Sequence, residues 1–104
     1  MYARVARWEG GEPEAIRRTA DEIDQEVKSG GGPPEGVPAA GMMLLTDPDT
    51  GRVMFVSLFE TEEDRRKGDE TLNAMSPPGD GMGRRAAVEF YDVAVEARMQ
   101  GAAG

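Results

Sequence analysis

The residues of this sequence that could do chemistry gather near its two ends. Tyr2, Arg4 and Trp8 stand at even positions of an extended opening segment and so share one face of a strand. Trp8 would supply an aromatic wall and Arg4 a cation for an anionic ligand. Near the other end, Tyr91 adds a second phenol able to transfer a proton, and Asp92 a carboxylate facing the same way as Arg4. These five are the predicted ligand-binding residues, and none is assigned a catalytic role.

Each of these residues also has a purely structural interpretation. Trp8 would seal an edge of the core or of a dimer, because aromatic side chains routinely fill both. Arg4 and Asp92 would form an ion pair or lie at a strand edge, because a charge on a covered face needs a partner. The tyrosines would bury their rings and hydrogen-bond their hydroxyls. Both interpretations stay open at the level of the sequence.

The sequence contains no His and no Cys. This excludes Ser-His-Asp catalysis, imidazole metal sites, an axial His for haem, thiolate nucleophiles and disulfides. Proton transfer would have to use carboxylates, Lys, Tyr or water. Asp47, Asp49 and Gly51 have the spacing of a calcium loop, but the acid needed at the fifth position is Gly51 and the Glu needed at the twelfth is Leu58. We therefore predict no cofactor and no metal site.

Length and charge narrow the class of protein. A chain of 104 residues corresponds to one domain, which we expect to span residues 1–99, with a disordered tail at 100–104. The net charge of -8 argues against nucleic acid as a partner, and basic residues scattered among acids argue against a membrane surface. There is no apolar run near 18 residues and no signal-peptide pattern, so we expect a cytoplasmic location.

The element that organises the chain is the predicted hairpin Gly41–Glu60. Its turn contains Pro48, which presets φ, and Gly51, which tolerates a positive φ. Both flanking strands carry apolar residues on both faces, whereas an antiparallel sheet in a small domain usually leaves one face to water. Two helices can cover one face. A second copy of the chain, related by a two-fold axis, is predicted to cover the other.

Periodicity places the remaining elements around this hairpin. Helices are expected from Pro13 to Ser29 and from a Thr61 cap to about Met75, the second with Gly68 as either a close approach to the sheet or a break. Strands are expected at 2–8, 42–46, 53–59 and 84–99, the last with a bulge near Asp92. The loops at 30–38 and 76–83 are flexible connections that could close as lids.

This order of elements predicts a ferredoxin-like α+β fold, βαββαβ, with a four-stranded antiparallel sheet and two helices on one face. The small residues Ala3 and Val5 suit the face beneath the helices. Tyr2, Arg4 and Trp8 are then expected on the opposite face, toward a pocket or a partner.

Three segments carry a resemblance to a known family. The opening YARVARWEGG with its Pro13-started helix, the step MFVSLFETEED and the closing strand VEFYDVAVE are similar to those of the dimeric α/β-barrel superfamily, which includes antibiotic-biosynthesis monooxygenases. The resemblance covers Tyr2 to about Met99 and lies in element order and local sequence rather than in a catalytic motif. It implies a homodimer whose sheets pack face to face, with ligands held between sheet and helices.

The functional residues of that family do not transfer. The haem-degrading branch relies on a His ligand, which this sequence lacks, and its supporting residues cannot be placed on Asn73 or Trp8. The branch of cofactor-independent oxygenases, which acts on aromatic polyketide-like substrates, stays open. The leading hypothesis is therefore a homodimeric small-molecule-binding protein, acting as a monooxygenase-like enzyme on an aromatic or hydrophobic substrate. The alternative is a non-catalytic dimerisation or ligand-sensing module, and a cavity of about 300 Å³ or more near Trp8 would count against it.

Overall fold

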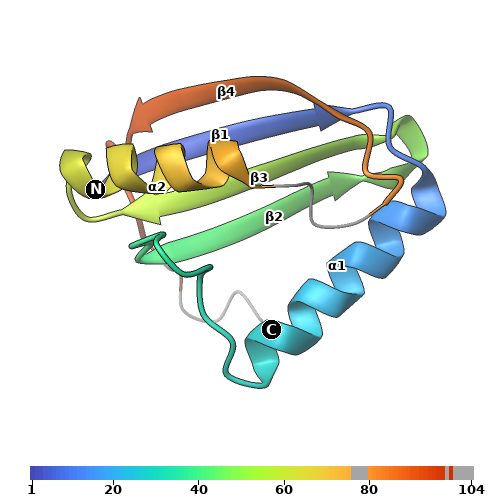
Figure 1. Ribbon diagram of the computed structural model, residues 1–104, viewed down its shortest axis with the longest axis horizontal. Coiled ribbons are helices and arrows are strands. Elements are labelled where there is room, and N and C mark those ends of the chain that lie inside the picture. The colour runs from blue at the N-terminus through green and yellow to red at the C-terminus, as the bar shows by residue number, and fades with distance from the viewer. Residues whose placement is uncertain (76–79, 98, 100–104) are drawn as a thin grey trace.

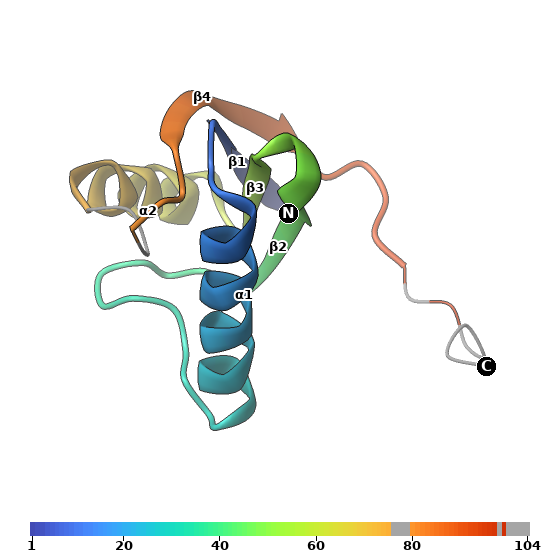
Figure 2. The same ribbon diagram turned by 90° about the vertical axis from the view of Figure 1, so that its right-hand side faces the viewer.

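The computed structural model of this chain describes residues 1–75, 80–97 and 99. The elements in order are β1 (Tyr2–Glu9), α1 (Pro13–Lys28), β2 (Gly41–Asp47), the 3-10 helix η1 (Pro48–Thr50), β3 (Arg52–Phe59), α2 (Glu62–Ala74) and β4 (Arg84–Asp92). The strands form one antiparallel sheet in the order β2-β3-β1-β4 (Figure 1). Both helices lie on one side of it (Figure 2). The predicted ferredoxin-like α+β fold is confirmed.

Local sequence explains where the helices begin. Pro13 occupies the first turn of α1, where a missing N–H costs nothing. Thr61 caps α2, because its hydroxyl accepts a hydrogen bond from the Asp64 backbone N–H at 3.0 Å. In the hairpin, Gly51 has a φ of 73°, a left-handed conformation that favours glycine. The predicted helix starts and the predicted tight turn are thus confirmed.

The two faces of the sheet are exchanged relative to the sequence-based expectation. The strand register places Tyr2, Arg4 and Trp8 on the face beneath the helices, which we call the helix face. Ala3 and Val5 lie on the opposite, open face. Their burial there comes from their central position in the sheet, where neighbouring side chains surround small residues. The predicted orientation was wrong because it assumed that a covered face must be apolar, whereas Arg4 finds polar partners on α2.

The apolar core lies on the helix face, at the end of the sheet that holds α1. Ile16, Val53 and Met82 are buried together, and Trp8 packs against them with the partly buried side chains of Leu44 and Phe55. A second buried contact lies under α2, where Phe59 is fully enclosed and Gly68 approaches its ring. Gly68 therefore permits the close approach that was one of its two predicted roles.

The helix α1 is anchored by its first half only. Ala15, Ile16 and Thr19 are buried, whereas Val27 near the other end is 50% exposed. In both views the second half of α1 extends past the β2 edge of the sheet (Figures 1 and 2). The loop that follows is held against α2: Val37 is buried, and the Thr71 hydroxyl donates a hydrogen bond to the Gly36 carbonyl at 3.1 Å.

The last strand is shorter than predicted. It ends at Asp92 rather than near Met99, and Asp92 pairs with Tyr2, the first residue of β1. One hydrogen bond, from the Val93 N–H to the Met1 carbonyl, continues the pairing. The register irregularity lies between Arg7 and Trp8 on β1, at the other end of β4 from the predicted bulge. The predicted disordered tail, and residues 76–79 of the second predicted loop, lie outside the described residues.

Within the residues that the structure describes, no helix has the length and apolar composition needed to cross a membrane.

Candidate functional site

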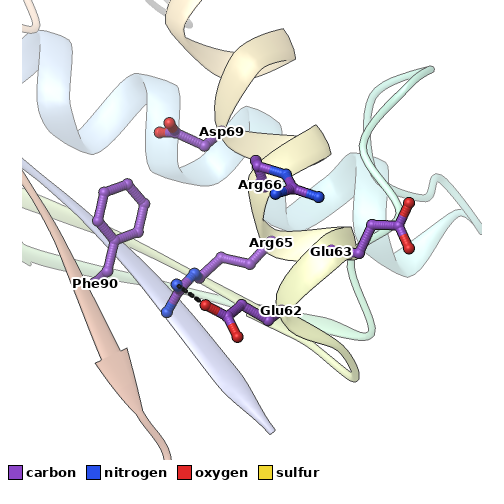
Figure 3. Close-up of a pocket in the computed structure, with 6 residues that line it drawn as sticks. All are labelled: Glu62, Glu63, Arg65, Arg66, Asp69 and Phe90. Atoms are coloured by element: carbon purple, nitrogen blue, oxygen red, sulfur yellow. Dashed lines mark ion pairs between the residues drawn. The ribbon is translucent and has the colours of Figure 1, made fainter.

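A cavity lies between helix α2 and strand β4. The helix packs mainly over β1 and β3, and it reaches β4 through side chains such as Arg65, which lies on the ring of Phe90. This cavity is an open groove of about 470 Å³, which we call the α2–β4 groove. Its lining is mostly charged, with one aromatic wall (Figure 3): Glu62, Glu63, Arg65, Arg66, Asp69 and Phe90.

Arg65 is held between aromatic rings at one end of this groove. Its guanidinium carbon lies 5.0 Å from the centre of the Phe90 ring and 5.5 Å from that of Tyr2. A cation over an aromatic face is attracted by the negative charge of the ring face. Arg65 also pairs with Glu62 at 3.7 Å. The groove therefore presents aromatic rings and a planar cation side by side, two surfaces on which a flat ligand can stack.

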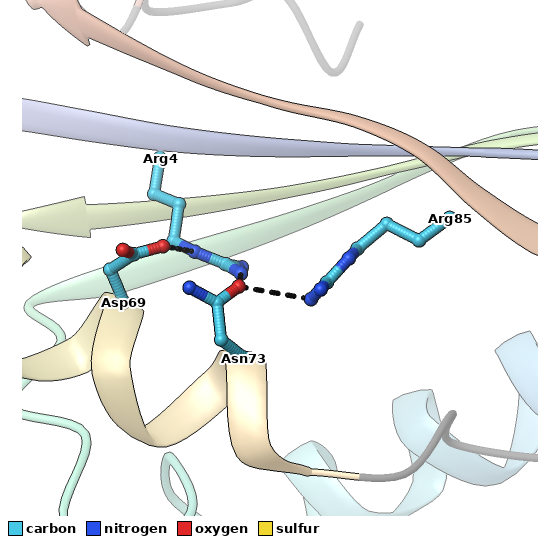
Figure 4. A network of polar contacts seen from close by, with 4 residues as sticks. All are labelled: Arg4, Asp69, Asn73 and Arg85. Atoms are coloured by element: carbon cyan, nitrogen blue, oxygen red, sulfur yellow. Dashed lines mark hydrogen bonds and ion pairs between the residues drawn. The ribbon is translucent and has the colours of Figure 1, made fainter.

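A polar network continues from the groove toward the C-terminal end of α2 (Figure 4). The Arg4 Nε donates to Asp69 Oδ1 at 2.8 Å, and an Arg4 terminal nitrogen donates to Asn73 Oδ1 at 3.0 Å. A terminal nitrogen of Arg85 donates to the same Asn73 oxygen, also at 3.0 Å. Strand β1, helix α2 and strand β4 are thus joined through one amide oxygen.

The ion pair of Arg4 and Asp69 is the structural anchor of this network. Arg4 is only 3% exposed, so its charge is compensated almost entirely by protein atoms. Removing one partner of such a buried pair typically costs about 3–5 kcal/mol, because the other charge is left without compensation. The expected ion pair of Arg4 therefore exists, but with Asp69 instead of Asp92.

The structure brings two of the five predicted site residues to the groove. Tyr2 touches it through Arg65, and Arg4 through Asp69. Asp92 stands opposite Tyr2 in the strand register and is exposed at the end of β4. Trp8 packs in the core at the far end of β1, as its structural interpretation predicted.

Tyr91 lies on the open face and is half-exposed, away from the groove. On the same face the Arg7 Nε donates to Glu89 Oε1 at 2.5 Å. This hydrogen bond is the main cause of two pKa shifts: the pKa of Glu89 is lowered below its ordinary value, and that of Arg7 is raised. Both groups stay charged at neutral pH, so they form a fixed polar point on this face, which also carries the ion pair of Arg52 and Asp47 at the hairpin end.

A second, smaller cavity opens next to Trp8, at the hairpin end of the sheet. Its volume is about 270 Å³, below the 300 Å³ at which small-molecule sites usually begin. It is lined by Arg7, Trp8, Glu9, Leu45, Thr46, Asp47, Arg52, Val53 and Met54. The site near Trp8 is therefore a weaker candidate than the α2–β4 groove.

The sequence reasoning missed the polar face of α2. Arg65, Asp69 and Asn73 recur at intervals of four residues, so they line one side of the helix. The sequence-based prediction for this helix identified its Thr61 cap and Gly68, but not a polar face directed at the sheet. A buried arginine at Arg4 was the matching signal, since it requires a carboxylate partner.

Residues 1–75, 80–97 and 99 hold no group of three or more Asp or Glu side chains placed to bind a metal ion. A scan against protein-family models and a search of curated proteins each found no match to this sequence.

Proposed function

We propose that this chain is the subunit of a homodimeric α/β barrel that binds an aromatic or hydrophobic small molecule in the α2–β4 groove. The observation that carries the proposal is the groove itself. Its volume of about 470 Å³ falls within the range of small-molecule sites. Its aromatic wall is the ring of Phe90, and the Arg65 guanidinium lies against that ring and against the ring of Tyr2 behind it. Such a lining favours a flat aromatic ligand over an aliphatic one.

The open face of the sheet supports the homodimer. Its side chains are mainly apolar, and Met43, Leu45 and Tyr91 are each about half-exposed. Contiguous exposed apolar surface of this kind marks interaction sites. Its charged side chains are paired with each other, Arg7 with Glu89 and Arg52 with Asp47, so these pairs add no net charge that would repel a second copy. A second copy placed on a two-fold axis would match apolar surface with apolar surface.

The chain that follows β4 supports the same partner. In Figure 2 it leaves the sheet on the side away from α2, where the second copy would lie. Val95 there is 84% exposed, and Met99 is also exposed. A second copy on the open face would offer these apolar side chains a surface to pack against.

Native mass spectrometry of the freshly purified protein is the first test. We expect the mass of a dimer, and a ligand retained from the expression host would appear as additional mass. Binding is then measured with a panel of aromatic polyketide-like compounds on the wild type and on Phe90→Ala. The variant should bind more weakly, because it loses the aromatic wall of the groove. A stable monomer, or binding that is insensitive to Phe90→Ala, would contradict the proposal.

Catalysis is a separate part of the proposal, and we assign it the class that the resemblance implies: oxidation of the bound aromatic by O2 without a cofactor. Oxygen consumption and product mass are followed for every compound that binds. The second candidate function is a non-catalytic dimerisation or ligand-sensing module. It is favoured by a sequence without His or Cys, since proton transfer would fall to carboxylates, Lys, Tyr or water. Tight binding without oxygen consumption across the panel would select that function.

A further inference from the structure

The polar network beside the groove holds more positive than negative charge. Arg4 and Arg85 contribute two guanidinium groups, and Asp69 contributes the single carboxylate. That carboxylate is bonded to Arg4. The atom on which the two arginines converge is the amide oxygen of Asn73, which is neutral. Because each guanidinium nitrogen lies 3.0 Å from this oxygen, the two nitrogens are no more than 6.0 Å apart.

Within the described part of the chain, Arg85 forms no ion pair, as is also true of Arg18 and of Arg66 in the groove lining. All acids of the chain lie in the part that the structure describes, and none of them is within ion-pair distance of Arg85. The neighbouring Arg84, by contrast, is paired with Glu9 at 3.6 Å. Arg85 differs from the other two unpaired arginines in its arrangement, because it shares the neutral Asn73 oxygen with Arg4. This arrangement leaves one positive charge next to a cavity.

The network and the groove form one continuous surface. Asp69 lines the groove and also belongs to the network, and Arg65, Asp69 and Asn73 follow each other along the same side of α2. The eight helical steps from Arg65 to Asn73 span about 12 Å of helix. A ligand that stacks on Phe90 and reaches Arg85 would therefore have to be elongated.

Resting on the proposed function, we propose that the ligand is an elongated aromatic anion, with a carboxylate or enolate group bound by Arg85 and Asn73 and its rings in the α2–β4 groove. The anion would accept a hydrogen bond from Arg85 and another from the Asn73 side-chain NH2 group. Arg4 stays paired with Asp69 and contributes its positive charge without a hydrogen bond to the ligand. Two guanidinium groups and one resident carboxylate thus become neutral when a monoanion binds.

The test compares two fluorescent probes of equal shape, anthracene-2-carboxylate and the neutral anthracene-2-carboxamide, by fluorescence anisotropy. We expect the wild type to bind the carboxylate about tenfold more tightly, which corresponds to about 1.4 kcal/mol. Arg85→Gln should bring the ratio of the two affinities close to one. Arg84→Gln is the matched control, since it removes the same charge from the adjacent residue, and it should leave the ratio unchanged.

A second variant tests the excess of charge without any ligand. Asn73→Asp is nearly isosteric and places a carboxylate between the two guanidinium groups. We expect it to raise the thermal unfolding temperature, even though a negative charge near the end of a helix is unfavourable, and to abolish the preference for the anionic probe. A lowered unfolding temperature would overturn the inference.

The outcomes separate this inference from the proposed function. If both probes bind equally and Phe90→Ala weakens both, the proposed function stands and the anion site is wrong. If Arg84→Gln and Arg85→Gln change the affinity ratio equally, the anion site is also wrong, because general electrostatics explains the effect. If neither probe binds at millimolar concentration, ligand binding in the groove fails and takes the anion site with it.

Discussion

At the scale of single residues, the approach of helix α2 to the sheet depends on Gly68, which has a hydrogen atom where any other residue has a side chain. A Cβ added at Gly68 would lie 2.5 Å from the Phe59 ring, which is fully enclosed. Alanine normally stabilises a helix interior by about 1 kcal/mol relative to glycine. We predict the opposite here: Gly68→Ala should lower the free energy of unfolding by about 1 kcal/mol or more, because overpacking typically costs about 1–3 kcal/mol. Urea denaturation measures the change.

The control for this prediction is the double variant Gly68→Ala with Phe59→Leu. Phe59→Leu alone should destabilise the protein, since it leaves a gap under α2. Combined with Gly68→Ala it should cost less than the sum of the two single changes, because the new methyl group occupies part of that gap. Additive effects would show that the ring is not what limits the approach of the helix.

The ion pair of Glu89 predicts how the stability of the protein depends on pH. Its pKa is lowered from the ordinary 4.5 by the Arg7 hydrogen bond. A lowered folded-state pKa contributes stability that is present above about pH 4.5 and is lost as the pH falls through the folded-state value. Glu89→Gln should therefore flatten the acid limb of a plot of stability against pH, while leaving the neutral plateau slightly lower. Glu22→Gln on the exposed side of α1 removes the same charge; an equal flattening there would contradict the assignment to Glu89.

At the scale of elements, α1 is divided into an anchored half and an unsupported half. Ile16 is fully buried, and Val27 is half-exposed. Ile16→Ala should lower the free energy of unfolding by about 3 kcal/mol, within the range measured for buried aliphatic truncations. Val27→Ala on the same helix should change it by less than about 0.5 kcal/mol. Denaturant titration of both variants checks the difference, and similar costs would mean that the second half of α1 packs against something else.

The element scale also shows what the sequence could predict. Caps, breakers and alternation located both helices and all four strands, because these signals are local: Pro13, Thr61 and Gly51 act on their own neighbours. The end of β4 was misjudged because strand length depends on the partner strand, and Val93 to Met99 are as suitable for a strand as the residues before them. The partner β1 simply begins at Tyr2.

The candidate site was less predictable than the fold for a related reason. Strand alternation correctly grouped Tyr2, Arg4 and Trp8 on one face, but no local signal says which face the helices cover. That choice is made by tertiary contacts, above all by Asp69 on Arg4. Phe90 and Arg85 enter the site from β4, and α2 brings Asn73 to meet Arg85. Only a chain that is already folded brings these residues together.

At the scale of the whole molecule, the proposed dimer predicts a difference between two neighbouring methionines. Met42 and Met43 are 48% and 51% exposed on the same edge strand, but Met43 is on the open face and Met42 on the helix face. Met43→Glu should convert the dimer to a monomer and remove the dependence of thermal stability on protein concentration. Met42→Glu, the matched control, should leave both properties as in the wild type.

Size-exclusion chromatography with light scattering gives the mass of the particle. Thermal unfolding at several protein concentrations shows whether the unfolding temperature depends on concentration. Equal effects of the two substitutions would indicate that a new charge on β2 disturbs the strand itself. If the unfolding temperature of the wild type does not vary with protein concentration, the proposed dimer on the open face is contradicted.

The place of β1 in the middle of the sheet has a consequence for the order of folding. Strand β1 comes first in the order of described elements, and it pairs on one side with β3 and on the other with β4, the last strand of the sheet in chain order. Ala3 pairs directly with Tyr91, although almost the entire sequence of the domain separates the two residues. Contacts this distant in sequence make folding slow relative to helical bundles of similar size, because a large loop must close first. A nascent chain extending only through α2 holds a central strand with one unpaired edge, and the sheet is completed only after Arg84–Asp92 has been made.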